Sequence, residues 1–294
     1  MKNSLVLAIA VLPMLLNSCD IQPAPEVAYL TVDTLMVAPK TNQGTASSKL
    51  TTLWMEQDGE QMGAFTPPCT IPVVARENTT IRFIPGINLN GSYAQRNQYE
   101  MLSPNSVTWD LAVQSTKNVA TSRTTFEYNT AYTIEVLEDF DDVGLNYVHT
   151  IKSDTTLQFT SEMDEALNIN GEWPNKSGKY VLPPMTRGEF KTLQAFDLPK
   201  YGANVWMEID YKTDVALTFG IFANEPLQSI QTPVVTLFPN DEWNKVYINL
   251  VTEVSAYPAA QDYHLFFGSI NTSQDTTTTY IDNIKLLYWV FLSA

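Results

Sequence analysis

Apolar and polar residues alternate with a period of two along much of this chain, and this pattern predicts β-strands. The alternation is clear in Tyr29–Asp33 and again in Val205–Tyr211, where one face is apolar and the other is mixed. No segment of the first half keeps the 3.6-residue period of an amphipathic helix. Helix is expected only as one short turn near Asp164–Ala166.

The other candidate strands are short and are separated by Pro, Gly and Asn, as in antiparallel sandwiches. Asp58-Gly59 is a residue pair that suits a tight hairpin turn between two of them. The candidate strands cover residues 50–55, 61–65, 71–75, 80–84 and 106–114, and then 132–137, 146–151, 156–160, 178–182, 192–197, 205–212, 216–223, 232–238, 243–250, 263–270 and 279–288. We therefore predict an all-β fold built from two antiparallel β-sandwich modules.

A stretch rich in Thr, Ser and Asn between residues 115 and 129 marks the expected boundary between the modules. We expect an N-terminal β-sandwich over residues 28–117 and a linker over 118–131. The C-terminal β-sandwich is expected over residues 132–294.

The first nineteen residues have the organisation of a secretory signal, with Lys2 followed by the apolar run Leu5–Leu16. This run is too short to span a bilayer. It ends in Leu16-Asn17-Ser18-Cys19, which resembles the bacterial lipobox. That resemblance implies a lipoprotein signal peptide over residues 1–18, a diacylglycerol and a fatty acid on Cys19, and a tether over residues 19–27. Since more than one acyl chain gives stable anchoring, we expect a membrane attachment through lipid alone. The alternative is an ordinary signal followed by an unmodified cysteine.

The charge of the chain excludes one class of partner. It carries 17 Lys and Arg against 32 Asp and Glu, a formal net charge of −15. Such a surface repels nucleic acids and anionic head groups, so no nucleic-acid partner is expected. Cys69 is the only other cysteine, so no disulfide framework is expected if Cys19 is lipidated.

Motifs for catalysis are absent from the sequence. It contains no G-x-S-x-G elbow and no H-E-x-x-H or C-x-x-C spacing, and His149 and His264 fall on separate predicted strands. Glu208 and Asp210 share one face of a strand, but no glycosidase spacing marks them. We therefore expect a protein that is not an enzyme and needs no catalytic cofactor.

Aromatic residues offer the main alternative to a purely structural role, because exposed rings can contact sugar faces. Trp173 falls in the predicted loop 170–174 and Tyr201 in a turn, so these two are the candidate interaction residues. Trp206 and Trp243 fall in alternating strands, and we expect them in the core.

Two parts of the chain resemble known modules. Leu53–Pro67, followed by Ile71-Pro72-Val73, resembles PEGA-like domains, which are small β modules. Glu138–Asp141, Trp243–Leu250 and Tyr280–Leu286 resemble the first and last strands of carbohydrate-binding-module jelly rolls. The second resemblance implies a jelly-roll C-terminal module with a structural calcium ion, for which the matching acids are Glu138, Asp139, Asp141 and Asp282.

The whole arrangement resembles a lipoprotein family of the Bacteroidota outer membrane, including BamG-like accessory lipoproteins of the β-barrel assembly machinery. The resemblance implies a lipid-anchored scaffold subunit whose partners are an outer-membrane β-barrel complex and other lipoproteins. Cell-surface display is expected, although a single acid, Asp20, replaces a longer acidic run after Cys19 and leaves the periplasmic face as an alternative. The alternative function is a surface glycan-binding lipoprotein of a polysaccharide-uptake system.

Overall fold

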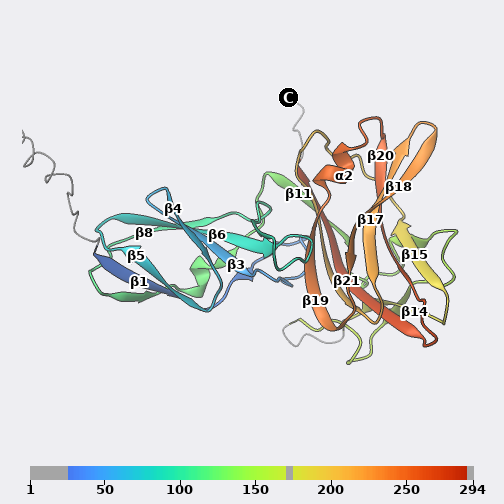
Figure 1. Cartoon of the computed structure of the whole chain (residues 1–294), viewed down its shortest axis with the longest axis horizontal. Helices are drawn as coiled ribbons and strands as arrows, with labels where there is room; N and C mark the ends of the chain where they lie inside the picture. The colour runs from blue at the N-terminus through green and yellow to red at the C-terminus, as the bar shows by residue number, and fades with distance from the viewer. Residues whose placement is uncertain (1–25, 170–174, 290–294) are drawn as a thin grey trace, which may run out of the picture.

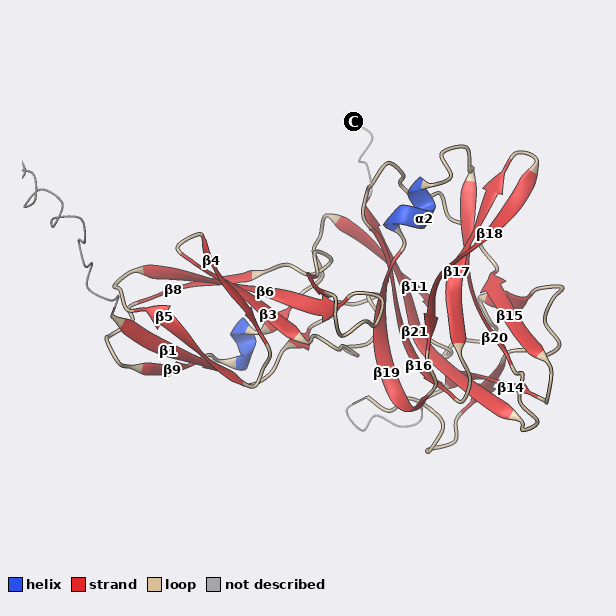
Figure 2. Ribbon diagram, viewed as in Figure 1, coloured by secondary structure: helices blue, strands red, loops and turns tan. Residues whose placement is uncertain are grey.

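The computed structural model describes residues 26–169 and 175–289. The predicted signal peptide, Cys19, most of the tether and Trp173 lie outside these described residues, so their predicted roles stay predictions. Two β-rich domains follow one another along the long axis of the molecule (Figure 1). Nearly all regular structure is strand (Figure 2), which confirms the predicted all-β fold.

The N-terminal domain is built from short strands in two layers. Its larger sheet has the order β4-β3-β6-β7, with β8 also paired to β6, and faces a sheet of order β5-β1-β9 and a pair of strands, β10 and β2. The elements are β1 (Val27–Val32), β2 (Met36–Val37), β3 (Thr52–Gln57), β4 (Glu60–Phe65), β5 (Cys69–Val74), β6 (Thr79–Asn88), β7 (Arg96–Gln98), β8 (Asn105–Trp109), β9 (Thr116–Asn118), η2 (Thr121–Arg123) and β10 (Thr125–Phe126).

The segment predicted as a linker, residues 118–131, belongs to the N-terminal domain, so this prediction is corrected. β9 pairs in parallel with β1, and β10 pairs in parallel with β2. Phe126 and Tyr128 are buried in the core of that domain. The Thr- and Asn-rich composition that suggested a linker therefore belongs to short strands, a 3₁₀ helix and the turns between them.

The C-terminal domain is a sandwich of two antiparallel sheets. One has the order β13-β14-β21-β16-β19 with β11 also paired to β21, and the other has the order β12-β15-β20-β17-β18. The elements are β11 (Tyr132–Glu138), β12 (Tyr147–His149), β13 (Gln158–Thr160), β14 (Ser177–Leu182), β15 (Arg187–Thr192), β16 (Val205–Thr213), β17 (Leu217–Glu225), β18 (Gln228–Leu237), β19 (Asn240–Asn249), α2 (Val251–Ser255), β20 (Asp262–Ile270) and β21 (Thr277–Trp289).

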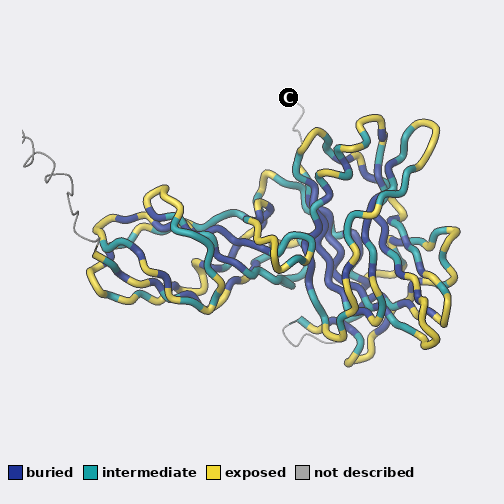
Figure 3. Tube along the Cα trace, in the orientation of Figure 1, coloured by how far each residue is buried: buried dark blue, intermediate teal, exposed yellow. Residues whose placement is uncertain are grey.

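The two domains meet through the sheet that contains β16, β19 and β21. Trp206, Tyr247 and Leu287 of that sheet join the hydrophobic core of the N-terminal domain rather than that of their own sandwich. Buried segments therefore lie on both sides of the contact (Figure 3). None of the helices among the described residues has the length and apolar character needed to cross a bilayer.

Packing at Gly220 in β17 leaves no room for a side chain. A Cβ there would lie 2.2 Å from the Thr232 carbonyl oxygen and 2.6 Å from the Phe266 ring. We predict that Gly220→Ala lowers the free energy of unfolding by about 1–3 kcal/mol, because backbone must move to admit the methyl group. Chemical denaturation measures this, with Thr218→Ala on the same strand as the control that loses less than about 1 kcal/mol. Equal stability of Gly220→Ala and the wild type would contradict the packing.

Candidate binding groove at the domain junction

Side chains alternate along β16, so that one face of the strand packs in the C-terminal domain and the other contacts the N-terminal domain. Met207 and Ile209 enter the C-terminal core, whereas Trp206, Glu208 and Asp210 point toward the N-terminal domain. The carboxylates of Glu208 and Asp210 are buried, although they lie on what would be the solvent face of an isolated sandwich.

Two lysines on the neighbouring strands balance these carboxylates. Lys245 of β19 lies opposite Asp210, and Lys285 of β21 lies opposite Glu208. The Lys245 ammonium is 3.3 Å from Asp210 Oδ2 and 3.4 Å from Glu208 Oε2. None of the four residues is more than 6% exposed. Since removing ions from water costs several kcal/mol each, such a group is tolerated only with good geometry and further hydrogen bonds.

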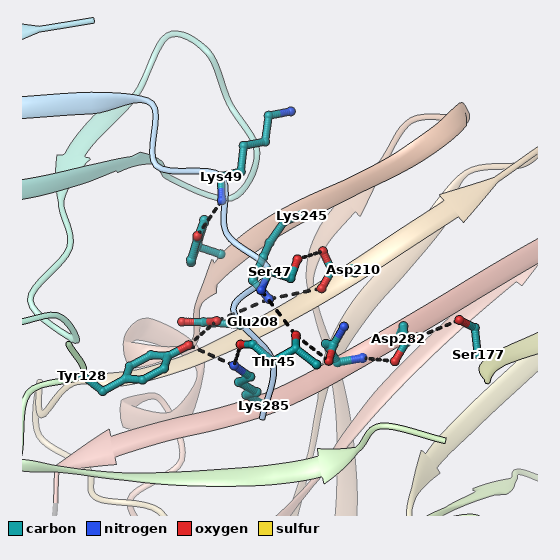
Figure 4. A network of polar contacts seen from close by, with 12 residues as sticks. Thr45, Ser47, Lys49, Tyr128, Ser177, Glu208, Asp210, Lys245, Asp282 and Lys285 are labelled. Carbon is teal, nitrogen blue, oxygen red and sulfur yellow. Dashed lines mark hydrogen bonds and ion pairs between the residues drawn. The ribbon is translucent and has the colours of Figure 1, made fainter. Parts of the chain in front are cut away.

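The N-terminal domain supplies further hydrogen bonds to Glu208, and Figure 4 shows the one from Tyr128. Tyr99 donates its hydroxyl to Glu208 Oε1 at 2.8 Å, and Tyr128 donates to Oε2 at 2.9 Å. Burial, followed by the charge of Glu208, raises the pKa of both phenols well above their usual value, so they remain donors.

A segment that we call the strap, residues 38–51, covers the remaining charges. Ser47 donates to Asp210 at 2.7 Å, and Lys285 donates to the Thr45 carbonyl oxygen at 2.9 Å. Gly44 lets the strap pass this point, because its φ is +74° and a Cβ there would lie 2.7 Å from Lys285 Cε. The network is therefore complete only when the two domains are docked.

The pKa values of the two buried lysines shift in opposite directions. It lowers the pKa of Lys285 to about 8, against a smaller opposing attraction from Glu208. Burial would also lower the pKa of Lys245, but Asp210 and Glu208 together outweigh it and hold that pKa above its usual value. Lys245 is thus the firmly charged partner of the two acids.

A groove of about 690 Å³ opens beside this network, between the two domains. A second hollow of about 430 Å³ shares Lys49, Trp243, Asn244 and Lys245 with it and extends it. The main groove is lined by aromatic rings and by amides from both domains: Tyr93, Tyr211, Phe238, Trp243 and Tyr247, with Asn88, Asn90, Asn240 and Asn244.

Two of the rings are widely open to solvent. Tyr93 of the N-terminal domain is 78% exposed, and Phe238 of the C-terminal domain is 83% exposed. Lys49 Nζ lies 5.9 Å from the centre of the Tyr93 ring and also donates to the Asn244 side chain. Through Lys49, the exposed Tyr93 ring of the N-terminal domain is therefore connected to Asn244 of the C-terminal domain.

The amides of the groove are held in fixed positions. Asn244 donates to the Tyr211 hydroxyl at 3.1 Å, and Asn90 Oδ1 accepts the backbone N–H of Asn249 at 2.9 Å. Lys49 donates its backbone N–H to the Tyr247 hydroxyl at 2.9 Å. A groove with exposed rings and positioned amides is suited to binding a ligand that combines apolar faces with hydroxyl groups.

The interaction residues predicted from sequence do not line this groove. Trp173 lies outside the described residues. Tyr201 is 85% exposed, but it sits in the turn before β16 and is not part of the groove lining. Trp206 is buried at the junction, as expected, whereas the expectation of a core position for Trp243 is only partly right. Trp243 donates its Nε1–H to the Glu165 carbonyl oxygen and also lines the groove.

The four acids expected around calcium form hydrogen bonds with groups of the protein itself. Both carboxylate oxygens of Glu138 accept backbone N–H groups, from Phe140 and Asn146. Those of Asp282 accept from Ser177 and Asn283, and burial raises the pKa of this carboxyl well above its usual range. In the parts of the chain that the structure describes, no group of three or more His, Cys, Asp or Glu side chains could hold a metal ion. Asp139 accepts the backbone N–H of Asp141, and Asp141 accepts that of Lys176. Among the described residues these acids therefore do not form the cluster that the calcium site requires.

Glu208 and Asp210 were considered from sequence only as a catalytic pair without a supporting motif. The structure binds both to Lys245, so they are structural. Tyr93 and Phe238 were not singled out from the sequence. The only available signals were that Tyr93 follows Asn90-Gly91 and that Phe238, the last residue of a predicted strand, precedes Pro239.

Comparisons with known proteins place the chain in no family. No protein-family model matches it, and no curated protein matches it. The chain is similar to three solved structures, each at 12% identity. The enzymatically active domain of tailspike protein 4 of bacteriophage CBA120 has a TM-score of 0.35, over 53% of this chain and 19% of that one. The family 11 carbohydrate-binding module of a Clostridium thermocellum cellulase has a TM-score of 0.35, and the match covers 55% of this chain and 98% of that one. The CBM22-1 xylan-binding domain of Paenibacillus barcinonensis has a TM-score of 0.40, and the match covers 52% of this chain and 93% of that one.

Removal of the central carboxylate tests the junction. We predict that Glu208→Gln lowers the free energy of unfolding by roughly 3 kcal/mol, because it leaves buried positive charge without its partner. Urea denaturation measures the loss. Asp241→Asn, at an exposed acid on β19, is the control and should change stability by less than about 0.5 kcal/mol. A loss no larger than that of the control would show that the buried charges do not hold the domains together.

The lowered pKa of Lys285 predicts a pH effect. The pKa of Lys285 is about 8 in the folded chain, against its ordinary value of 10.5 in the unfolded chain. Between these two pH values the unfolded state therefore binds more protons than the folded state. Stability contributed by this group therefore rises with pH across that window. We expect the stability of the wild type relative to Lys285→Met to increase between about pH 7 and about pH 9.5 in urea denaturation. A constant or falling difference would contradict the assignment.

Proposed function

We propose that this chain is a non-catalytic binding protein that holds a neutral polysaccharide in the groove between its two domains. The observation that carries the proposal is the pair of exposed rings, Tyr93 and Phe238, one on each domain, beside a floor of positioned amides. Aromatic rings pack against the apolar faces of sugar rings, while amides exchange hydrogen bonds with their hydroxyls.

The buried charges support binding because they fix the groove in advance. Glu208 is bonded to both domains, so the separation of the rings does not have to be set when the ligand arrives. A preformed site loses less conformational entropy on binding than one that must be assembled. Together with the predicted lipidation of Cys19, the proposal describes a glycan-binding lipoprotein held at a membrane.

A scaffold role in β-barrel assembly is the second candidate. The rigid junction favours it, since two interlocked domains present their loops to a partner at a fixed distance and angle. A scaffold of this kind should co-purify with an outer-membrane β-barrel protein after mild detergent extraction. Co-purification without binding to any polysaccharide would favour the scaffold over the glycan binder.

The exposed rings provide the direct test of glycan binding. In native affinity gels containing neutral polysaccharides (mixed-linkage glucan, xylan or glucomannan), we expect at least one polymer to retard the wild type. Tyr93→Ala and Phe238→Ala should each weaken the interaction about fivefold to tenfold, because an aromatic contact contributes on the order of 1 kcal/mol.

Tyr201→Ala is the matched control, since it removes an equally exposed ring outside the groove. It should be retarded like the wild type. The proposal fails if no neutral polymer retards the wild type, or if the variant that lacks both groove rings is retarded as strongly as the wild type.

A further inference from the structure

The C-terminal sandwich has a second outer surface that the N-terminal domain leaves open. We call it the far face: the outward side of the sheet β12-β15-β20-β17-β18, which lies away from the N-terminal domain (Figure 1). Two hollows of about 450 Å³ and 460 Å³ lie on it and share Lys152, Glu189 and Gln231. They therefore form one continuous groove.

The charge of this groove is opposite to that of the protein. Its lining contains three cations, Lys152, Arg187 and Lys191, and one carboxylate, Glu189. The whole chain has 17 Lys and Arg against 32 Asp and Glu. None of the three cations forms an ion pair with another described residue, so their charges remain available to a ligand.

The strand geometry places the charges in a row. Arg187, Glu189 and Lys191 alternate along β15, so their side chains project from the same face. Arg187 and Lys191 are four residues apart, which corresponds to roughly 13 Å along the strand. Two cations at this spacing fit repeated anionic groups along a polymer better than they fit one small anion.

The single carboxylate is already engaged within the protein. Its two oxygens accept the Thr150 hydroxyl and the Gln231 amide, each at 2.7 Å. The other end of the Gln231 amide accepts a hydrogen bond from Lys152 Nζ. This chain of contacts holds Lys152 at the place where the two hollows join.

Aromatic surface lies within the same groove. Phe222 and Phe266 pack with their ring centres 5.1 Å apart, and the Lys191 ammonium lies 5.9 Å from the centre of the Phe222 ring. Cations beside a partly open ring combine a site for an anionic group with a site for the apolar face of a sugar.

From these features we infer that the far face is a second binding site, one that takes polysaccharides carrying carboxylate or sulfate groups. It is separate from the junction groove and does not depend on the function proposed there. The recessed shape of the groove suits a single polymer chain better than the surface of a bilayer.

Three polymers test the inference on the complete protein. Dextran sulfate and polygalacturonate carry sulfate and carboxylate groups, and unmodified dextran is the neutral probe. We expect isothermal titration to detect binding of at least one anionic polymer but not of dextran, with an affinity that falls as salt is added. Binding of only one of the two identifies the preferred anionic group and supports the inference.

The variant Arg187→Gln/Lys191→Gln should bind the anionic polymer at least tenfold more weakly. Arg123→Gln/Lys117→Gln removes two cations from the N-terminal domain and should bind within twofold of the wild type. Equal losses in the two double variants would show a general charge effect and would overturn the assignment.

The Tyr93→Ala/Phe238→Ala variant separates this site from the junction groove, because it should keep its affinity for the anionic polymer. A loss of that affinity would place both ligands in one groove and overturn the second site. Retention on phosphatidylserine vesicles with no binding of either anionic polymer would also overturn it, in favour of a membrane contact.

Discussion

Glu208, Asp210, Lys245 and Lys285 are buried on a sheet face that would be exposed to water if the C-terminal sandwich stood alone. Burial deprives these ions of hydration, and the tyrosine hydroxyls, the strap and the opposite charges replace it. A buried cluster of charges does not by itself make a protein more stable, since apolar residues of the same volume often give equal or higher stability. Its effect is on specificity: only one placement of the N-terminal domain brings Tyr99, Tyr128 and the strap to their partners.

That single placement explains how the surface of the C-terminal domain is divided. The sheet containing β16 is covered by the N-terminal domain, and a groove forms along the edge of the contact. The sheet containing β17 keeps its outer side open. The two grooves differ in the residues that line them. The groove at the junction is lined largely by amide and aromatic side chains, whereas the far face consists of regular strands with charged side chains at alternate positions. The two surfaces therefore differ in the charge that they present to the solvent.

The sequence was sufficient for the fold class, because alternation with a period of two reports directly on strands. It also placed Glu208 and Asp210 on one face of a strand. It could not show that this face is buried, since a solvent face and an interdomain face have the same polar pattern. The linker prediction over residues 118–131 failed for a related reason: polar composition does not distinguish a tether from a short helix and strand such as η2 and β10. Tyr93 and Phe238 lie in loops 145 positions apart (238 − 93 in the numbering of the sequence), and only the docked domains bring them to one groove.

The strap also has a consequence for how the protein is made. Thr45 meets Lys285 across 240 residues of sequence. During synthesis the strap leaves the ribosome well before the strand that it covers. Contacts between such distant positions form late and slow the final folding step. Before the two domains dock, Trp206, Tyr247 and Leu287 lack their apolar contacts with the N-terminal domain. The partly folded chain therefore exposes an apolar surface of the kind that chaperones bind.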